Sequence, residues 1–207
     1  GLVGSEMCIR DRYNTFINMS LGSNFKAEKL RITTKSKSIA KKTSPMLGIN
    51  PGASYGSSKR WYPEEFAKVA IELSTKYHIL IFGGKNEKNI ATDIEKLLVR
   101  NGVKNFQNLA GKTSINQLVD YIAELDLFIT GDSGPMHIAA SFEVPTISIF
   151  GPTKDLETSQ WMNESSIIVK KNLDCQPCMK RSCPLGHHNC MKSLKANEVL
   201  DAVKLVV

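Results

Sequence analysis

One short stretch of this sequence carries residue types that could bind an anion: TGDSGPMHIAA at positions 130–140. The apolar run at 125–129 predicts a buried strand before it, and Pro135 suits the first turn of a helix after it. Residues 132–134 are therefore expected on a strand-to-helix turn, where free backbone N–H groups and the positive helix end favour phosphate. A capped turn without a ligand, in which Asp132 is only the N-cap, is the alternative.

A second loop, GASYGSSKRW at positions 52–61, follows a short predicted strand. Its glycines and serines offer backbone donors, and Lys59 and Arg60 add two cations, so the loop is suited to hold phosphate groups. Its spacing is neither GxxxxGK[ST], the P-loop, nor GxGxxG, the dinucleotide fingerprint. The loop therefore predicts a phosphate site of another kind.

The elements around these loops alternate between apolar strands and amphipathic helices. Strands are predicted at 46–50, 77–82, 106–109, 125–129, 145–150 and 166–169. Pro63 is expected to open a helix, Asn101-Gly102 to end one and Ser114 to cap one, with further helices over 135–142 and around 199–203. This order indicates an α/β fold, a Rossmann-like doubly wound parallel sheet covered on both faces. Both loops then lie at the carboxyl edge of the sheet, where such folds bind ligands.

Composition limits the possible partners. The chain has 207 residues, 42% of them hydrophobic and 23% charged, with a net charge of +7. Much of the basic excess lies in 26–42 and 170–195, which suits phosphate-bearing ligands or an anionic membrane surface. No basic face is interleaved with aromatic residues, so we expect no nucleic acid partner. No apolar run approaches the roughly 20 residues that span a bilayer.

The N-terminal region differs in composition from the rest. Residues 1–12, GLVGSEMCIRDR, show no helical periodicity and resemble a translated sequencing adapter, so we expect a non-native leader that includes Cys8. Residues 13–44 are rich in Lys, Ser and Thr and are interpreted as a linker with the remnant of a preceding domain. Because the first residue is not Met, we expect the chain to be a fragment whose folded part is 45–207.

Several ordered motifs resemble the C-terminal half of glycosyltransferase family 9. They read PGASYGSSKRWYPEEF, LIFGG, NLAGKTSINQL, DLFITGDSGPMHIAAS and VPTISIFGPT, followed by CQPCMKRSCPLGHHNCM and a terminal helix. The resemblance implies the GT-B architecture, two Rossmann-like domains that face a cleft. Residues 45–207 would be its C-terminal, nucleotide-sugar-binding donor domain, and the N-terminal acceptor domain would be absent.

The resemblance also implies an activity, the inverting transfer of heptose from ADP-heptose to a heptose of the lipopolysaccharide inner core. No metal or other cofactor is expected, so protein charges must stabilise the diphosphate. The catalytic base is expected in the absent domain, and the isolated chain is therefore expected to be inactive. The implied location is cytoplasmic, with peripheral contact to the inner membrane face, where the acceptor lies.

Donor-binding residues follow from matching these motifs residue by residue. Lys59 matches the phosphate-binding lysine, assisted by Arg60, while residues 54–56 approach the phosphates and Asp132 accepts sugar hydroxyls. The helix end completes the diphosphate site, and looser alignment places Thr113 near the adenine and Glu87 near the ribose. The full set is Ser54, Tyr55, Gly56, Lys59, Arg60, Glu87, Thr113, Asp132, Ser133, Gly134 and His137.

Ordinary alternatives exist for individual residues of this set. Lys59 could be a solvated loop lysine, and Glu87 a surface carboxylate. His137 could be a helix-face histidine paired with a carboxylate.

Four cysteines form a cluster with the spacing Cys175-x2-Cys178-x4-Cys183-x6-Cys190. Such a set can bind zinc, but the spacing matches no standard finger and the resemblance implies no metal, so packed or free thiols are favoured. Other functions remain open: another family 9 glycosyltransferase, a non-catalytic nucleotide-binding domain, or a zinc-binding module. A nucleotide-sugar epimerase of similar architecture is disfavoured by the cysteine cluster and the GDSGPMH turn.

Overall fold

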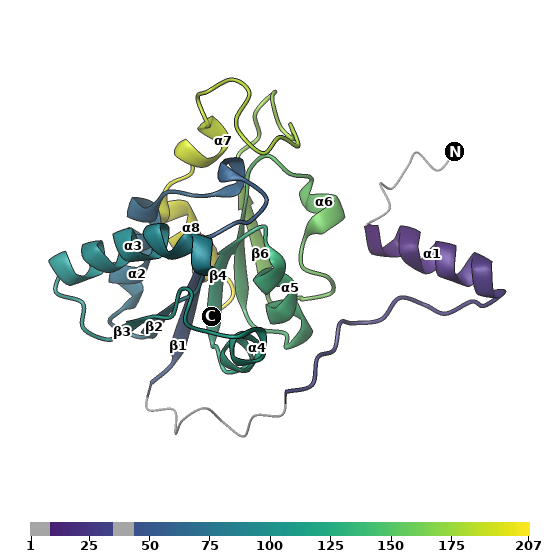
Figure 1. Cartoon of the computed structure of the whole chain (residues 1–207), viewed down its shortest axis with the longest axis horizontal. Helices are drawn as coiled ribbons and strands as arrows, with labels where there is room; N and C mark the ends of the chain where they lie inside the picture. The colour runs from purple at the N-terminus through teal and green to yellow at the C-terminus, as the bar shows by residue number, and fades with distance from the viewer. Residues whose placement is uncertain (1–8, 35–43) are drawn as a thin grey trace.

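The computed structural model describes residues 9–34 and 44–207 and contains a six-stranded sheet in the order β3-β2-β1-β4-β5-β6 (Figure 1). Every neighbouring pair is parallel. The strands are β1 Met46–Asn50, β2 His78–Ile81, β3 Phe106–Asn108, β4 Leu127–Gly131, β5 Thr146–Phe150 and β6 Ser166–Lys170. Chain order reverses between β1 and β4, so the predicted doubly wound sheet is confirmed.

Helices cover both faces of this sheet. The helices of the described residues are α1 Ile9–Leu21, η1 Ser57–Lys59, α2 Pro63–Leu73, η2 Lys85–Glu87, α3 Lys88–Arg100, α4 Ile115–Ala123, α5 Gly134–Ser141, α6 Asp155–Thr158, α7 Asn189–Lys192 and α8 Ala196–Val203, and α1 does not pack on the sheet. Side chains of α2, α3 and α8 form one buried cluster with the sheet, and those of α4 and α5 form a second. The two clusters are the two interfaces of a three-layer α/β domain.

Strand β2 shows why both faces are apolar. Successive side chains of a strand point to opposite faces, and Ile79 and Ile81 belong to the first cluster while Leu80 and Phe82 belong to the second. On β1, a Cβ added to Gly48 would lie 2.8 Å from Cδ2 of Phe128, so only glycine leaves room for the packed rings there. These strands therefore read as continuous apolar runs.

Element boundaries follow the local hydrogen bonds. The N-cap Ser114 is confirmed, because its hydroxyl accepts a hydrogen bond from Gln117 N. Strand β4 begins two residues later than predicted, since Leu125 N donates to Ile122 O and closes α4. The sequence did not predict η1, η2, α6 and α7, because three or four residues are too few to show a helical period.

Helix α1 crosses the predicted boundary between leader and linker. Its apolar residues Tyr13, Phe16, Ile17 and Leu21 recur at helical spacing within the stretch interpreted as a linker, and all four are exposed. Residues 1–8 of the expected leader, with Cys8, and 35–43 of the expected linker lie outside the described residues. The division of the chain at 12 and 44 stays a prediction. Within the described ranges, no helix is long and apolar enough to cross a membrane.

Candidate functional site

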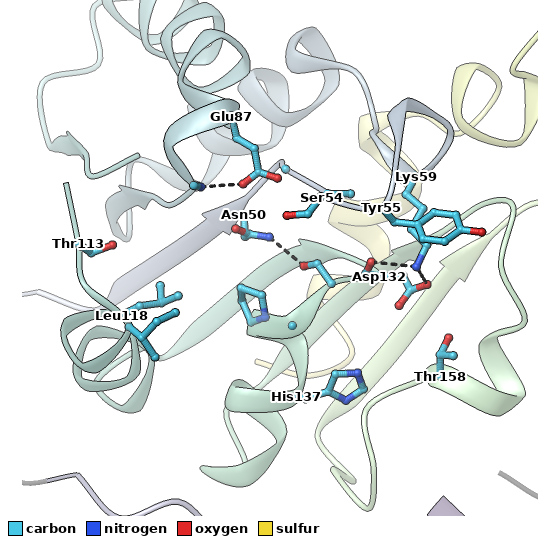
Figure 2. A pocket seen from close by; sticks show the side chains of 18 of the residues that line it. Asn50, Ser54, Tyr55, Lys59, Glu87, Thr113, Leu118, Asp132, His137 and Thr158 are labelled. Atoms are coloured by element: carbon cyan, nitrogen blue, oxygen red, sulfur yellow. Dashed lines mark hydrogen bonds and ion pairs between the residues drawn. The ribbon is translucent and has the colours of Figure 1, made fainter. Parts of the chain in front are cut away.

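A cavity of about 520 Å³ lies at the carboxyl edge of the sheet, where the chain order reverses (Figure 2). Its walls come from the loops after β1, β2 and β3 and from the turn between β4 and α5. We call it the β1/β4 cavity. Parallel strands place their following loops at one edge, which explains why residues as far apart in the sequence as Asn50 and Thr158 meet here.

An ion pair between Lys59 and Asp132 lies in the wall of this cavity (Figure 2). Lys59 Nζ is 2.6 Å from Asp132 Oδ2, and the two side chains are only 12% and 7% exposed. Thr153 Oγ1 donates to the same carboxylate oxygen at 2.6 Å. Lys59 Nζ also lies 4.8 Å from the centre of the Tyr55 ring, so Lys59 is a positioned cation and not a solvated loop lysine. An ammonium has three donors, so it can hold Asp132 and a ligand oxygen together.

Helix α5 begins in the same wall, with Ser133 as its N-cap. The Ser133 side chain makes no capping hydrogen bond, and its hydroxyl accepts instead from Asn50 Nδ2 at 3.0 Å. Asp132 is not the N-cap, because its carboxylate binds Lys59 and Thr153. The positive end of α5 therefore faces the cavity, and the Ser133 side chain does not occupy the backbone N–H groups there.

Glu87 joins the loops that follow β1 and β2. Its Oε2 accepts a hydrogen bond from Gly84 N at 2.7 Å, and the residue is 9% exposed. A Cβ added to Gly52 would lie 2.1 Å from the Glu87 carboxyl carbon, so only glycine allows this close approach. The interpretation of Glu87 as a surface carboxylate is therefore wrong.

Most of the predicted donor residues gather in one place. Those that line the cavity are Ser54, Tyr55, Lys59, Glu87, Thr113, Asp132, Ser133, Gly134 and His137. Two others do not line it: the Arg60 guanidinium donates to Ala53 O at 3.4 Å, and Gly56 packs against Arg181. The contacts of these residues with a donor stay predictions.

Several lining residues were missed by sequence reasoning. Asn50, at the end of β1, could have been found from its place at the carboxyl edge of a predicted strand. Thr158 lies on the short α6, and Thr153 reaches Asp132 from the loop after β5. Thr153 ends the motif VPTISIFGPT, but its contact with Asp132 arises only in the fold, and Thr158 lies outside the quoted motifs.

The cysteine segment, residues 175–190, lies beside the loop that follows β1, and its four thiols are free. All four border one small cavity, together with His187 and His188. Backbone donors led by His188 N lower the pKa of Cys183, whereas burial raises that of Cys190. Among residues 9–34 and 44–207, no three His, Cys, Asp or Glu side chains are arranged to hold a metal ion.

The fold and the position of the cavity define a class of protein, the doubly wound α/β domains, which as a class bind their ligands where the strand order reverses. Residues 11–189 match the profile of glycosyltransferase family 9 (heptosyltransferase). The chain belongs to this family, and within it resembles heptosyltransferase II over part of the full-length relatives.

Two curated relatives show the range of similarity. The chain is 45% identical over 198 residues to lipooligosaccharide heptosyltransferase 2 of Campylobacter jejuni subsp. jejuni serotype O:6, covering 93% of this chain and 62% of the relative. It is 27% identical over 164 residues to lipopolysaccharide heptosyltransferase 2 of Escherichia coli K12, covering 79% and 47%. The chain thus spans less than two thirds of the length of these relatives.

Solved structures match the fold. E. coli ADP-heptose lps heptosyltransferase II aligns with a TM-score of 0.68 and 22% identity, covering 100% of this chain and 54% of that one. E. coli heptosyltransferase WaaC with ADP aligns with a TM-score of 0.73 and 14% identity, covering 99% and 58%. The domain therefore corresponds to one half of the GT-B heptosyltransferase architecture.

Proposed function

We propose that this chain is the donor-binding part of an inverting heptosyltransferase that uses ADP-heptose in lipopolysaccharide core synthesis. The observation that carries the proposal is the Lys59–Asp132 pair beside the start of α5, in the wall of the β1/β4 cavity. The names of the relatives agree with it: lipooligosaccharide heptosyltransferase 2, and a WaaC structure with ADP-2-deoxy-2-fluoro heptose.

In this proposal the protein charges stabilise the leaving diphosphate. The acceptor hydroxyl attacks the anomeric carbon of the heptose as the bond to the β-phosphate oxygen breaks, and ADP leaves with the bonding electron pair. Lys59 and the positive end of α5 face the negative charge that develops on ADP. Asp132 accepts hydrogen bonds from sugar hydroxyls, while its Oδ2 keeps the ion pair with Lys59. The hydroxyl proton passes to a base outside this chain, so no catalytic base is assigned here.

The acceptor and the location complete the proposal. The acceptor is an inner-core heptose of lipopolysaccharide, presented at the inner membrane face, and the protein works on the cytoplasmic side of that membrane. We propose no nucleic acid partner and no metal or other cofactor. The chain alone binds the donor and does not transfer heptose, because orientation of the acceptor contributes up to roughly 7–11 kcal/mol that the donor site cannot replace.

Two measurements test this proposal. Isothermal titration of this 207-residue chain should detect binding of ADP and of ADP-heptose. Absence of binding by the folded protein would contradict the proposed function. Product formation from ADP-heptose and inner-core acceptor should occur with the full-length protein and not with this chain. Transfer by the chain alone at a comparable rate would overturn the assignment of the base to another part of the protein.

A further inference from the structure

Ser58, the residue immediately before Lys59, is bonded to the cysteine segment through all three of its polar groups. Ser58 N donates to Arg181 O at 3.1 Å, and the Ser58 hydroxyl donates to Lys180 O. Ser58 O lies 2.9 Å from His188 Nε2. The residue is only 2% exposed. A serine held at its amide, its carbonyl and its side chain has a fixed backbone, and so has the start of the next residue.

The tip of the β1 loop packs against the same stretch. Tyr55 OH donates to Met179 O at 3.0 Å, and the Arg181 guanidinium lies 5.2 Å from the centre of the Tyr55 ring. A Cβ added to Gly56 would come within 2.2 Å of Arg181 O, which shows how closely the two backbones approach. The Tyr55 ring, in turn, contacts the Lys59 ammonium.

His188 connects this contact to helix α2. Because Ser58 O is a carbonyl and can only accept, the proton must reside on His188 Nε2. Nδ1 lies 3.2 Å from Tyr62 OH, which donates to it in the neutral tautomer assigned in this way. The His188 backbone has φ 52°, in the left-handed region, and its amide donates to Cys183 Sγ at 3.3 Å. Both ring nitrogens are thus engaged with residues that flank Lys59.

We propose that Ser58 and His188 are positioning residues of the donor site, and that the cysteine segment acts as a brace that holds the Lys59 ammonium against Asp132. The proposal rests on the proposed function where it concerns donor binding. Neither residue lines the β1/β4 cavity, so both act through the backbone of the β1 loop and not by contact with the donor.

A pair of substitutions separates positioning from a purely structural role. His188→Gln keeps an amide donor near the Nε2 position, whereas His188→Asn is too short to reach Ser58 O but suits the left-handed backbone better. Positioning predicts that ADP binds about threefold to tenfold more weakly to the Asn variant and close to normally to the Gln variant, the range of one hydrogen bond. A structural role predicts the reverse order, in both Tm and affinity. His187→Gln, an exposed neighbour, is the matched control.

A double-mutant cycle tests whether His188 acts through Lys59. In a Lys59→Ala background, His188→Asn should weaken ADP binding by less than twofold, because the group that it positions is gone. An undiminished threefold to tenfold loss in that background would overturn the positioning role.

Amine labelling tests the brace without any donor. In the wild-type chain, Lys59 should react with an acylating reagent more slowly than Lys96, whose side chain is 69% exposed. His188→Asn should raise the labelling of Lys59 several-fold and leave Lys96 unchanged, as read by peptide mass spectrometry. Unchanged Lys59 labelling would refute the inference even where ADP binds. Increased labelling in a chain that does not bind ADP would support the brace and contradict the proposed function.

Discussion

The loop after β1 and the cysteine segment meet side by side, yet they use their residues in opposite ways. The loop contributes side chains: Lys59 pairs with Asp132, and Tyr55 packs on the Lys59 ammonium. The cysteine segment contributes mainly backbone carbonyls, those of Met179, Lys180 and Arg181, which accept from the loop. Apart from the His188 ring and the Arg181 guanidinium, the segment with the four thiols therefore contacts the loop through backbone atoms, which every residue has.

The largest expected effect is on ADP binding, when the Lys59 side chain is removed from the loop after β1. Lys59→Ala should weaken ADP binding roughly 10- to 150-fold, the equivalent of a charged hydrogen bond in a partly desolvated site. The loss should be smaller for AMP, which carries one phosphate. Titration of both nucleotides checks this, with Lys96→Ala on α3 as the control. An equal loss of ADP affinity in the two lysine variants would show that Lys59 contributes no more to ADP binding than an exposed surface lysine does.

Gly56→Ala tests the contact between the loop after β1 and the cysteine segment. The new Cβ would meet the Arg181 carbonyl at 2.2 Å, and backbone atoms cannot move aside as a flexible side chain would. We expect a loss of about 1–3 kcal/mol in the free energy of unfolding, as for overpacked cores. Chemical denaturation measures it, and Gly134→Ala is the control, because an added Cβ there meets nothing within 4 Å. A Gly56→Ala chain as stable as wild type would show that the two regions are not tightly joined.

Asp132→Asn tests whether Asp132 binds the sugar of the donor or only positions Lys59. The asparagine oxygen can still accept from Thr153, but the charge that holds Lys59 is lost. If Asp132 accepts from heptose hydroxyls, affinity for ADP-heptose should fall about threefold to tenfold more than affinity for ADP. Parallel titrations with the two ligands give the answer, and an equal change for both would restrict Asp132 to positioning Lys59.

The smallest effect concerns the chain just after the cysteine segment. Ala196 N and Lys68 Nζ each donate to Glu65 at 2.8 Å. Burial raises the pKa of Glu65, but these two hydrogen bonds and the charges of Lys68 and Lys195 together outweigh it, so the pKa lies below its ordinary value of 4.5. A lowered folded-state pKa contributes stability above 4.5 that is lost as the pH falls through the folded value.

Glu65→Gln should therefore reduce the loss of stability on acidification, by about 0.5–1 kcal/mol. Denaturation curves at neutral and at acid pH measure the difference. Glu64→Gln, at the exposed first turn of the same helix, is the control. If the free energy of unfolding falls equally with acid in wild type and in Glu65→Gln, the pKa of Glu65 is not lowered in the folded chain.

Much of the fold followed from pattern alone. The apolar runs and the Ser114 cap predicted the strands and α4, because a strand buried on both faces must be apolar throughout and a cap acts within one turn. Lys59 and Asp132 were predicted as site residues, since the loops after parallel strands share one edge. Helix α1 was not predicted, although Tyr13, Phe16 and Ile17 repeat at helical spacing.

The sequence by itself determined which residues carry charge at the sheet edge and which strands bring them there. Only the tertiary structure decided that Asp132 binds Lys59 and Thr153 instead of capping α5, and that Ser58 is held by residues more than a hundred positions away. The physical reason is the range of the signals. Periodicity and caps act within a few residues, whereas a loop carbonyl bonds to whatever donor the packed chain presents, and no residue type announces that choice.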